Sequence, residues 1–291
     1  VLRERLMLYQ DPSVAPFLTF APPGHFYSPI PPLDEAVERA RRVFADPPAT
    51  LPGIDLRLEA QLELAGELAP LQADFDPPDQ AVPGRRYHTD NPSYGPADAR
   101  VLQALLRHIR PDRVIEIGSG HSTALMLDVA DEHLDGLELT CIEPFDAVLR
   151  SVLRPEDAGR VEIVAAPVQE VDLDRFDRLA AGDLLFIDST HVVRAGSDVA
   201  REVFEILPRL RPGVVVHFHD LFYPFDYPAP WVAEGRAWSE AYLLRAFLEH
   251  NDRFEILLFP HYLRTVAPDR LRALWPHTPT GGGSLWLRRV R

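Results

Sequence analysis

The sequence predicts a doubly wound α/β domain, in which helices cover both faces of a mostly parallel sheet. From residue 113 onward, short apolar or β-branched runs alternate with stretches of helical periodicity, which is typical of parallel strands joined by crossover helices. The seven strand-like runs are RVIEI, ELTCIE, VEIVAA, DLLFID, GVVVHFHD, FEILLF and SLWLR. In such a sheet ligands bind beyond the carboxyl ends of the strands. The residues that follow each strand are therefore the first candidates for a site.

Helical stretches lie between these runs, as the predicted architecture requires. They are HSTALMLDVADE, FDAVLRSVL, GSDVAREVFEILPRL and WSEAYLLRAFLEHN, with a short helix near residues 269–274. Upstream, helices are expected at about 55–71 and 96–109. Residues 1–54 are rich in proline pairs and hold one helical patch, LDEAVERARRVFA. We expect residues 1–95 to form an N-terminal arm with a lid-like helical extension, and residues 96–291 to form the main domain.

Composition narrows the class of protein. The 291 residues are 46% apolar, enough for a sizeable core, and no apolar run approaches the roughly 18 to 20 residues that span a bilayer. The N-terminal residues lack the apolar stretch of a signal peptide, so a cytoplasmic protein without membrane contact is expected. The net charge of −14 argues against a nucleic-acid partner and favours a small-molecule substrate.

Two residue types limit the chemistry. Cys141 is the only cysteine, so an intrachain disulfide and a multi-cysteine zinc site are excluded. The 30 basic residues are all arginine, which removes lysine Schiff-base and lysine general-base mechanisms. Any metal ion would need oxygen or imidazole ligands.

A glycine turn follows the first strand in VIEIGSGHSTALML. Gly118 and Gly120 allow close approach of the backbone to a ligand, and the helix that begins near His121 points free N–H groups at it. Glu143 ends the second strand, where a carboxylate can accept hydrogen bonds from both ribose hydroxyls. A tight turn without a ligand is the simpler alternative.

Nicotinamide and adenosylmethionine sites both use such an acid. Thr123 stands where a G-x-G-x-x-G turn would have its third glycine, which weakens the dehydrogenase hypothesis. Glu116 inside the first strand, and Val168 and Gln169 after the third, where adenine would lie, favour adenosylmethionine.

At these residues the chain resembles the class I S-adenosylmethionine-dependent methyltransferases, in particular the catechol- and macrocin-like small-molecule O-methyltransferases. The resemblance covers about residues 85–290. It implies that the glycine turn cradles the methionine moiety, that the second-strand acid holds ribose, and that residues after the third strand border adenine. The final GGGSLWLRR resembles the antiparallel edge of that sheet, implying the strand order 3-2-1-4-5-7-6. The implied cofactor contacts are Glu116, Gly118, Ser119, Gly120, Glu143, Val168, Gln169 and Asp188.

Acidic and histidine side chains follow the fourth and fifth strands, in FIDSTH and VVVHFHD. Asp188, His219 and Asp220 are expected to converge beside the methyl group, with His191 three residues past Asp188. Such a set suits Mg²⁺ or Mn²⁺, or Fe²⁺ or Zn²⁺ if both histidines bind. In the related enzymes acids at these positions hold a metal that orients the substrate hydroxyls. Here His219 stands where an acid or amide is usual.

The alternative to a metal centre of Asp188, His219 and Asp220 is a metal-free polar cluster. In that case His191 or His219 acts as general base, with His191 as the first choice, and Asp188 and Asp220 position the acceptor. His217 is expected to be structural, because it alternates to the opposite face of its strand from Phe218.

Aromatic residues after the fifth strand are the predicted substrate wall, in LFYPFDYPAPWVAEGRAW. Packing against the following helix is the alternative for each of them. The substrate candidates are Tyr223, Phe225, Tyr227, Trp231, Glu240 and Tyr242, with Tyr94 from an upstream loop. The sequence thus predicts metal-assisted O-methylation of a natural product or sugar hydroxyl. A nicotinamide-dependent oxidoreductase and a non-catalytic adenosyl-binding protein are the alternatives. A homodimer contact through the N-terminal arm is also expected.

Overall fold

The structure is a computed structural model that describes residues 11–277, 279 and 281–291. It contains two compact units. The larger consists of Pro48–Phe225 and Ser239–Arg291, and the smaller consists of the described part of Val1–Pro47 together with Asp226–Trp238.

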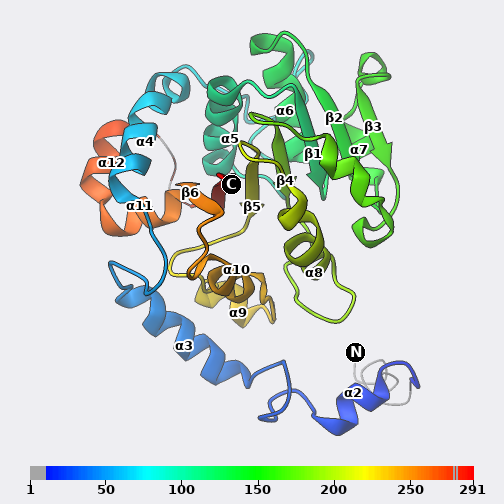
Figure 1. Cartoon of the computed structure of the whole chain (residues 1–291), viewed down its shortest axis with the longest axis vertical. Helices are drawn as coiled ribbons and strands as arrows, with labels where there is room; N and C mark the ends of the chain where they lie inside the picture. Colours follow the sequence, from blue (N-terminus) through cyan, green and yellow to red (C-terminus); the bar gives the residue numbers. More distant parts are fainter. Residues whose placement is uncertain (1–10, 278, 280) are drawn as a thin grey trace. The chain divides into compact units, whose positions relative to one another are not determined.

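A seven-stranded sheet forms the centre of the larger unit (Figure 1). Its strands are β1 (Arg113–Ile117), β2 (Glu138–Ile142), β3 (Val161–Val164), β4 (Leu184–Ile187), β5 (Val215–His219), β6 (Phe254–Leu258) and β7 (Ser284–Arg289). The order is β3-β2-β1-β4-β5-β7-β6, parallel except for β7, which is antiparallel to both of its neighbours. The predicted α/β class and strand order are confirmed.

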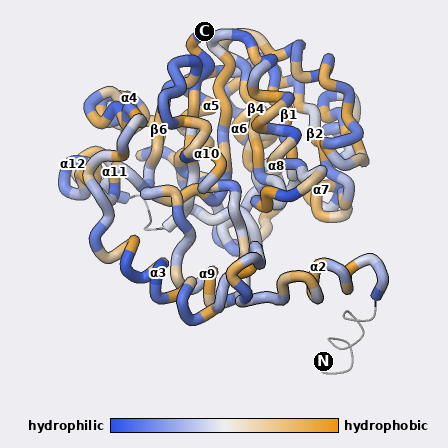
Figure 2. Tube along the Cα trace, turned by 60° about the horizontal axis from the view of Figure 1, so that its bottom comes forward, coloured by the Kyte–Doolittle hydropathy of each residue, from blue (hydrophilic) through white to orange (hydrophobic). Residues whose placement is uncertain are grey.

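The strands are apolar runs because helices cover the sheet. Every residue of β4 and β5 is buried, so neither face of these strands reaches water. In Figure 2 the strand traces are predominantly hydrophobic. Among the described residues, no helix is both long and apolar enough to cross a membrane.

Helices pack in a continuous row in the larger unit: α4 on α5, α5 on α6 and α6 on α7. Their bounds are α4 Leu58–Ala73, α5 Pro96–Ile109, α6 His121–His133 and α7 Ala147–Val152. A second group contains α8 (Asp198–Arg201), a single π-helical turn (Glu202–Ile206), three short 3-10 helices (Val168–Glu170, Leu173–Arg178 and Leu207–Arg209) and α10 (Glu240–Leu248). A further 3-10 turn, Pro155–Asp157, lies between β2 and β3.

Helices α11 (Pro260–Val266) and α12 (Pro268–Leu274) lie beside α4 and β6 at one end of the sheet (Figure 1). The sequence predicted the second of these and missed the first. Trp275, just after α12, donates from Nε1 to the carbonyl oxygen of Ala65 at 2.8 Å. This contact and the packing of α4 on α5 place residues 48–95 in the larger unit, so the division falls near residue 47 and not at the predicted boundary of residue 95.

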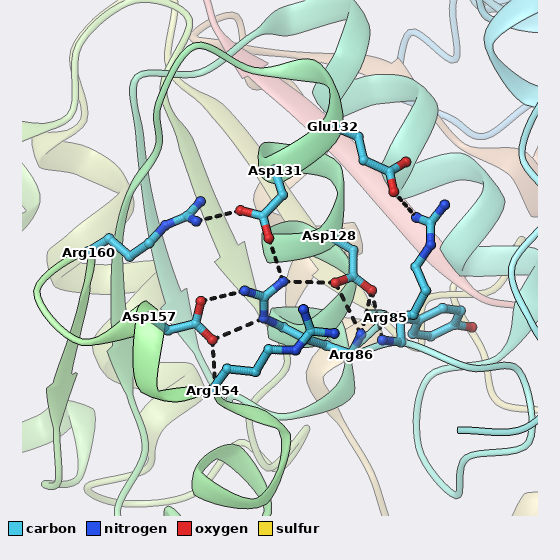
Figure 3. A network of polar contacts seen from close by, with 9 residues as sticks. Arg85, Arg86, Asp128, Asp131, Glu132, Arg154, Asp157 and Arg160 are labelled. Atoms are coloured by element: carbon cyan, nitrogen blue, oxygen red, sulfur yellow. Dashed lines mark hydrogen bonds and ion pairs between the residues drawn. The ribbon is translucent and has the colours of Figure 1, made fainter. Parts of the chain in front are cut away.

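A buried ion-pair network also fixes the segment before α5 to the larger unit (Figure 3). The guanidinium of Arg86 binds Asp128 and Asp131 of α6 through Nη1 and binds Asp157 through Nε and Nη2. The backbone N–H groups of Arg86 and Tyr87 both donate to Asp128. Side chains of Arg86, Asp128 and Asp157 are almost fully buried. These contacts therefore fix the start of the segment that runs from Arg86 to Tyr94.

The smaller unit contains α2 (Ala15–Phe20), α3 (Leu33–Ala45) and α9 (Ala229–Ala233). Helices α3 and α9 pack on each other, and Arg39 pairs with Asp226 at 3.4 Å. The guanidinium of Arg236 stacks on the rings of Trp231 and Trp238, at 4.3 and 4.9 Å from their centroids. Helix α3 has the predicted bounds, whereas α2 and α9 were not predicted.

Candidate active site

The turn after β1 requires glycine at its first position. Gly118 has φ of +79°, and a Cβ built there would lie 1.9 Å from the carbonyl oxygen of Asp188. The backbone N–H of Gly118 donates to Ile142 at the end of β2, and that of Asp188 donates to Ile117 at the end of β1. The predicted turn therefore lies where the ends of β1, β2 and β4 meet.

Glu116 lies beneath this turn and is completely buried. The hydroxyls of Ser122 and Thr123 donate to its two carboxylate oxygens, and the thiol of Cys141 lies 3.6 Å away. Burial raises the pKa of Glu116 to about 7, against the opposing effect of these hydrogen bonds. Glu116 was predicted to contact the cofactor, but here it holds the first turn of α6. A buried acid inside a strand cannot be distinguished from a ligand-binding acid in sequence alone.

Glu143 lies beside the glycine turn, as predicted. Its Oε2 accepts the Ser119 backbone N–H at 3.2 Å and its Oε1 accepts the Phe145 N–H at 2.8 Å. A carboxylate has about four acceptor positions, so each oxygen keeps one for a ligand hydroxyl. Phe145 is 84% exposed. The sequence interpretation assigned Phe145 only to a helix, although an exposed aromatic ring beside an acid that is predicted to bind ribose offers an apolar surface on which an adenosyl group can rest.

The two residues after β3 differ in their surroundings. Val168 is buried, whereas the side-chain amide of Gln169 donates to the carbonyl of Gly196 at 3.1 Å. Gln169 thereby ties the turn after β3 to the loop before α8. Both residues lie beyond the carboxyl end of β3, where they were predicted.

The predicted acids and histidines after β4 and β5 form one cluster centred on His191. Its Nε2 lies 3.4 Å from Asp188 and 3.8 Å from Asp220, and its Nδ1 lies 2.9 Å from Glu240. The His191 carbonyl accepts the N–H groups of Ser239 and Glu240 at the start of α10. Glu240 was predicted as a substrate contact, but it is buried and binds His191 instead. Its position 49 residues from His191 gave no signal of that pairing.

His219 lies on the other side of Asp220, with 3.5 Å between its Nε2 and an oxygen of that carboxylate. Its ring is 5.1 Å from the ring of Tyr94. Tyr94 is 1% exposed, so this predicted substrate contact packs against the cluster from the interior. His217 is fully buried between Phe186 and Trp286, and burial lowers its pKa well below 6.5. His217 is thus a neutral core residue, as expected.

The pKa values of the two aspartates in the cluster are shifted in opposite directions. Burial alone would raise the pKa of Asp188, but the positive charges of His219 and His191 outweigh it and lower that pKa. For Asp220 burial dominates and raises the pKa. Burial would lower the pKa of His191, yet its hydrogen bonds to Asp188 and Glu240 raise it well above 6.5. The two carboxylates thus favour the protonated form of His191, and in that form the imidazole cannot accept a proton.

The predicted metal ligands do not fit an ion in this arrangement. Asp188 and Asp220 are both directed at the His191 imidazole, and Asp220 also faces His219, so histidine rings balance the carboxylate charge. Within the described ranges, no group of three or more His, Cys, Asp or Glu side chains could hold a metal ion. The set of Asp188, His219 and Asp220 is correct as a cluster but lacks a coordination geometry.

The aromatic candidates lie in several environments. Tyr223 and Phe225 are buried in the larger unit, where both rings pack on Phe259 and the Tyr223 hydroxyl donates to the carbonyl of Pro48. They are core residues and do not form a pocket mouth. Tyr242 is 45% exposed on α10. Tyr227 and Trp231 belong to the smaller unit, where each ring packs against Trp238. A substrate role for these last three residues stays a prediction.

Comparison with known proteins gives a family match over this region. A family model described as a methyltransferase domain matches residues 115–221, which include the glycine turn, Glu143 and the whole His191 cluster except Glu240. An uncharacterized protein of Archaeoglobus fulgidus is 36% identical over 167 residues, covering 54% of this chain and 73% of that protein.

Solved structures with a similar fold include methyltransferases. PaMTH1 of Podospora anserina, bound to S-adenosylhomocysteine, is 17% identical with a TM-score of 0.46 and covers 87% of this chain and 96% of that one. CmcI with its D160 residue, Mg and S-adenosylmethionine, is 18% identical with a TM-score of 0.40 and covers 68% and 73%.

Proposed function

The chain belongs to the class I S-adenosylmethionine-dependent methyltransferases, and we propose that it methylates a hydroxyl group of a small-molecule acceptor. The observation that carries the proposal is the cluster of Asp188, His191 and Asp220 at the carboxyl ends of β4 and β5. There, two carboxylates with oppositely shifted pKa values lie within 3.8 Å of the same imidazole nitrogen, and the backbone of Asp188 adjoins the glycine turn. The net charge of −14 favours a small molecule over a polyanionic acceptor.

The chemistry of the donor set fits S-adenosylmethionine. Gly118, Ser119 and Gly120 would hold its methionine moiety at the start of α6, the remaining acceptor positions of Glu143 would take the ribose hydroxyls, and Phe145 would cover the adenosyl group. When bound, the cofactor supplies a methyl group on a positively charged sulfur, which an oxygen nucleophile can attack.

The two aspartates suit different tasks in such a transfer. Asp220 has the raised pKa and is the better proton acceptor, whereas Asp188 has the lowered pKa and stays ionised to position the acceptor hydroxyl. Asp188 is also the more exposed of the two, at 26% of its side chain against 19% for Asp220. We therefore assign the general base to Asp220 and give His191, held by Glu240, the task of fixing both carboxylates.

No step of this mechanism passes through a metal ion, because the carboxylates face imidazole rings in place of a shared ligand position. Extensive dialysis against EDTA is expected to leave methyl transfer unchanged. Full loss of activity that Mg²⁺ or Mn²⁺ restores would instead support the metal-assisted mechanism predicted from the sequence.

Calorimetric titration with S-adenosylmethionine, S-adenosylhomocysteine and NAD tests which cofactor the chain binds. We expect sub-millimolar binding of both sulfur compounds and no binding of NAD. A panel of hydroxylated acceptors, assayed for the mass increase of one methyl group, then tests the reaction. Binding of NAD alone would favour an oxidoreductase, and cofactor binding with methylated amines but no methylated hydroxyls would overturn O-methylation.

A further inference from the structure

A cavity of about 420 Å³ lies in the larger unit, between α5, α11 and α12. This volume falls within the range of small-molecule pockets. Its walls are mainly apolar and include Val101, Pro260, Leu271 and Trp275. Leu271 and Trp275 are each 5% exposed, and the Trp275 indole is fixed by its bond to Ala65. The cavity thus has a stiff aromatic wall that can pack against a flat apolar ligand.

Charged groups of opposite sign interrupt this apolar lining. Asp98 in the first turn of α5 is 8% exposed and accepts a hydrogen bond from the backbone N–H of Gly283. A Cβ at Gly282 would lie 2.6 Å from a carboxylate oxygen of Asp98, so the glycine run before β7 is fitted to this acid. Burial raises the pKa of Asp98.

Arg264 of α11 supplies the buried positive charge. Its Nη1 donates a long bond of 3.4 Å to the carbonyl of Pro279, and burial lowers the pKa of its guanidinium. Asp98 lines the same cavity and acts on the pKa of Arg264, but in the part of the chain that the structure describes no ion pair within 4 Å joins the two side chains. Arg272 also lines the cavity, but its side chain is 73% exposed and already pairs with Asp269 at 3.2 Å. A guanidinium that faces an apolar cavity without a close counter-ion is suited to bind an anionic group of a ligand.

The Asp98 end of the cavity adjoins the methyl-transfer cluster. Gly283 precedes Ser284, which pairs with His219 between β7 and β5. Asp98 and His219 each influence the pKa of the other, and Asp188 also acts on Asp98. A ligand in the cavity therefore has one end near the cluster and an anchor at Arg264.

We propose that this cavity binds an apolar, ring-containing small molecule with one anionic group, held by Arg264, and that the methyl acceptor belongs to this chemical class. The acceptor hydroxyl lies at the Asp98 end, beside His219 and Asp188, and the apolar body lies against Leu271 and Trp275. The presence of the cavity site is independent of the proposed function, whereas its assignment to the acceptor rests on that function.

Two fluorescent probes of nearly the same shape test the site: 8-anilinonaphthalene-1-sulfonate, which is anionic, and N-phenyl-1-naphthylamine, which is uncharged. The wild-type chain is expected to bind one equivalent of each. Arg264→Gln is expected to weaken the sulfonate about tenfold, the effect of losing one charged hydrogen-bond partner, and to change binding of the uncharged probe less than twofold. Arg270→Gln removes the same charge from α12, where Arg270 pairs with Glu59 at the surface, and is expected to bind both probes as the wild type does.

Filling the cavity gives the second arm of the test. Leu271→Trp is expected to weaken both probes at least tenfold, and Val101→Phe serves the same purpose if the first variant fails to fold. Equal sulfonate binding in Arg264→Gln and Arg270→Gln, wild-type binding in both filled variants, or no probe binding to the wild type would each overturn the site.

Calorimetry with S-adenosylhomocysteine separates this inference from the proposed function. All variants are expected to bind that compound as the wild type does. Its failure to bind the wild type would refute the methyltransferase reaction and leave the probe results standing. If an identified acceptor is methylated with no competitive inhibition by the sulfonate probe, the cavity is not the acceptor site.

Discussion

At the scale of single residues, the opposite pKa shifts of Asp188 and Asp220 lead to a kinetic prediction. Asp220→Asn removes the proton acceptor but keeps the size of the side chain, so kcat should fall about 10²- to 10⁴-fold, the usual contribution of a general base. Steady-state methyl transfer measures this fall. Affinity for S-adenosylhomocysteine should stay within about twofold, because Asp220 lies outside the glycine turn. A kcat equal to that of the wild type would remove Asp220 from the reaction.

The raised pKa of Glu116 leads to a predicted pH dependence of the free energy of unfolding. Its pKa is about 7 in the folded chain against 4.5 for an ordinary glutamate, so between these pH values the folded state holds a proton that the unfolded state has lost. The free energy of unfolding should therefore be highest below about pH 4.5 and fall as the pH rises through 7. At about 1.4 kcal/mol per pH unit the loss approaches about 3 kcal/mol.

Urea unfolding of the wild type and Glu116→Gln at pH 5 and pH 8 isolates this contribution from those of other acids. The amide cannot ionise, so the variant lacks this loss. Its free energy of unfolding, relative to that of the wild type, should therefore be higher at pH 8 than at pH 5. Parallel pH profiles for the two proteins would show that Glu116 is not the responsible group.

Sequence reasoning identified residue types better than residue tasks. Asp188, His191, His219 and Asp220 were expected together, because they follow neighbouring parallel strands and such strand ends share one edge of a sheet. The pairing of His191 with Glu240 could not be foreseen, since it depends on how α10 begins after a long loop. Phe145 and Asp98 were missed because burial and exposure, which distinguish them, are properties of the folded chain.

At the scale of elements, the Arg86 network should dominate the stability of the segment before α5. Arg86→Ala leaves the buried carboxylates of Asp128 and Asp157 without their positive partner, which should lower the free energy of unfolding by about 3 to 5 kcal/mol. Chemical denaturation monitored by circular dichroism measures the change.

Arg85 provides the matched control for this experiment, since it pairs with Glu132 at the surface, where both side chains are about 40% exposed. Arg85→Ala should cost less than about 1 kcal/mol. Similar losses for the neighbouring arginines would mean that burial does not set the strength of the network.

Elements with a strong pattern were predicted close to their observed bounds. Helices α3 and α5 begin and end at the predicted residues, and the seven strands coincide with their apolar runs. Helices α2 and α9 are only six and five residues long, too short for a helical period to appear. The long helix predicted after β4 is instead a sequence of α, π and 3-10 turns, which no periodicity distinguishes.

At the scale of the whole molecule, ligand binding should be visible as stabilisation. S-adenosylhomocysteine at about 100 times its Kd should add about 2.7 kcal/mol, and so raise Tm by several degrees. Thermal scans with and without the compound measure the shift. Gly118→Ala should abolish it, because the methyl group collides with the Asp188 carbonyl. An unchanged shift in that variant would place the cofactor elsewhere.

The division of the chain into units was beyond the reach of sequence patterns. Residues 226–238 group with an N-terminal segment from which more than 170 residues separate them in sequence, as the packing of α3 on α9 and the Arg39–Asp226 ion pair reveal. The position of residues 48–95 likewise depends on Arg86 and Trp275, whose partners are distant in the chain.

The single cysteine has a practical consequence. Cys141 lies in β2, paired with β1 on one side and β3 on the other, is 0% exposed, and its thiol has a pKa raised well above 9 by burial. A thiol-reactive dye should therefore label the native chain only when the sheet opens, so the labelling rate reports the frequency of that opening at one defined position. Because S-adenosylhomocysteine should bind above the same strands, its addition should slow the labelling in proportion to its occupancy. The labelling rate of Cys141 thus measures how often the native sheet opens, without an engineered cysteine.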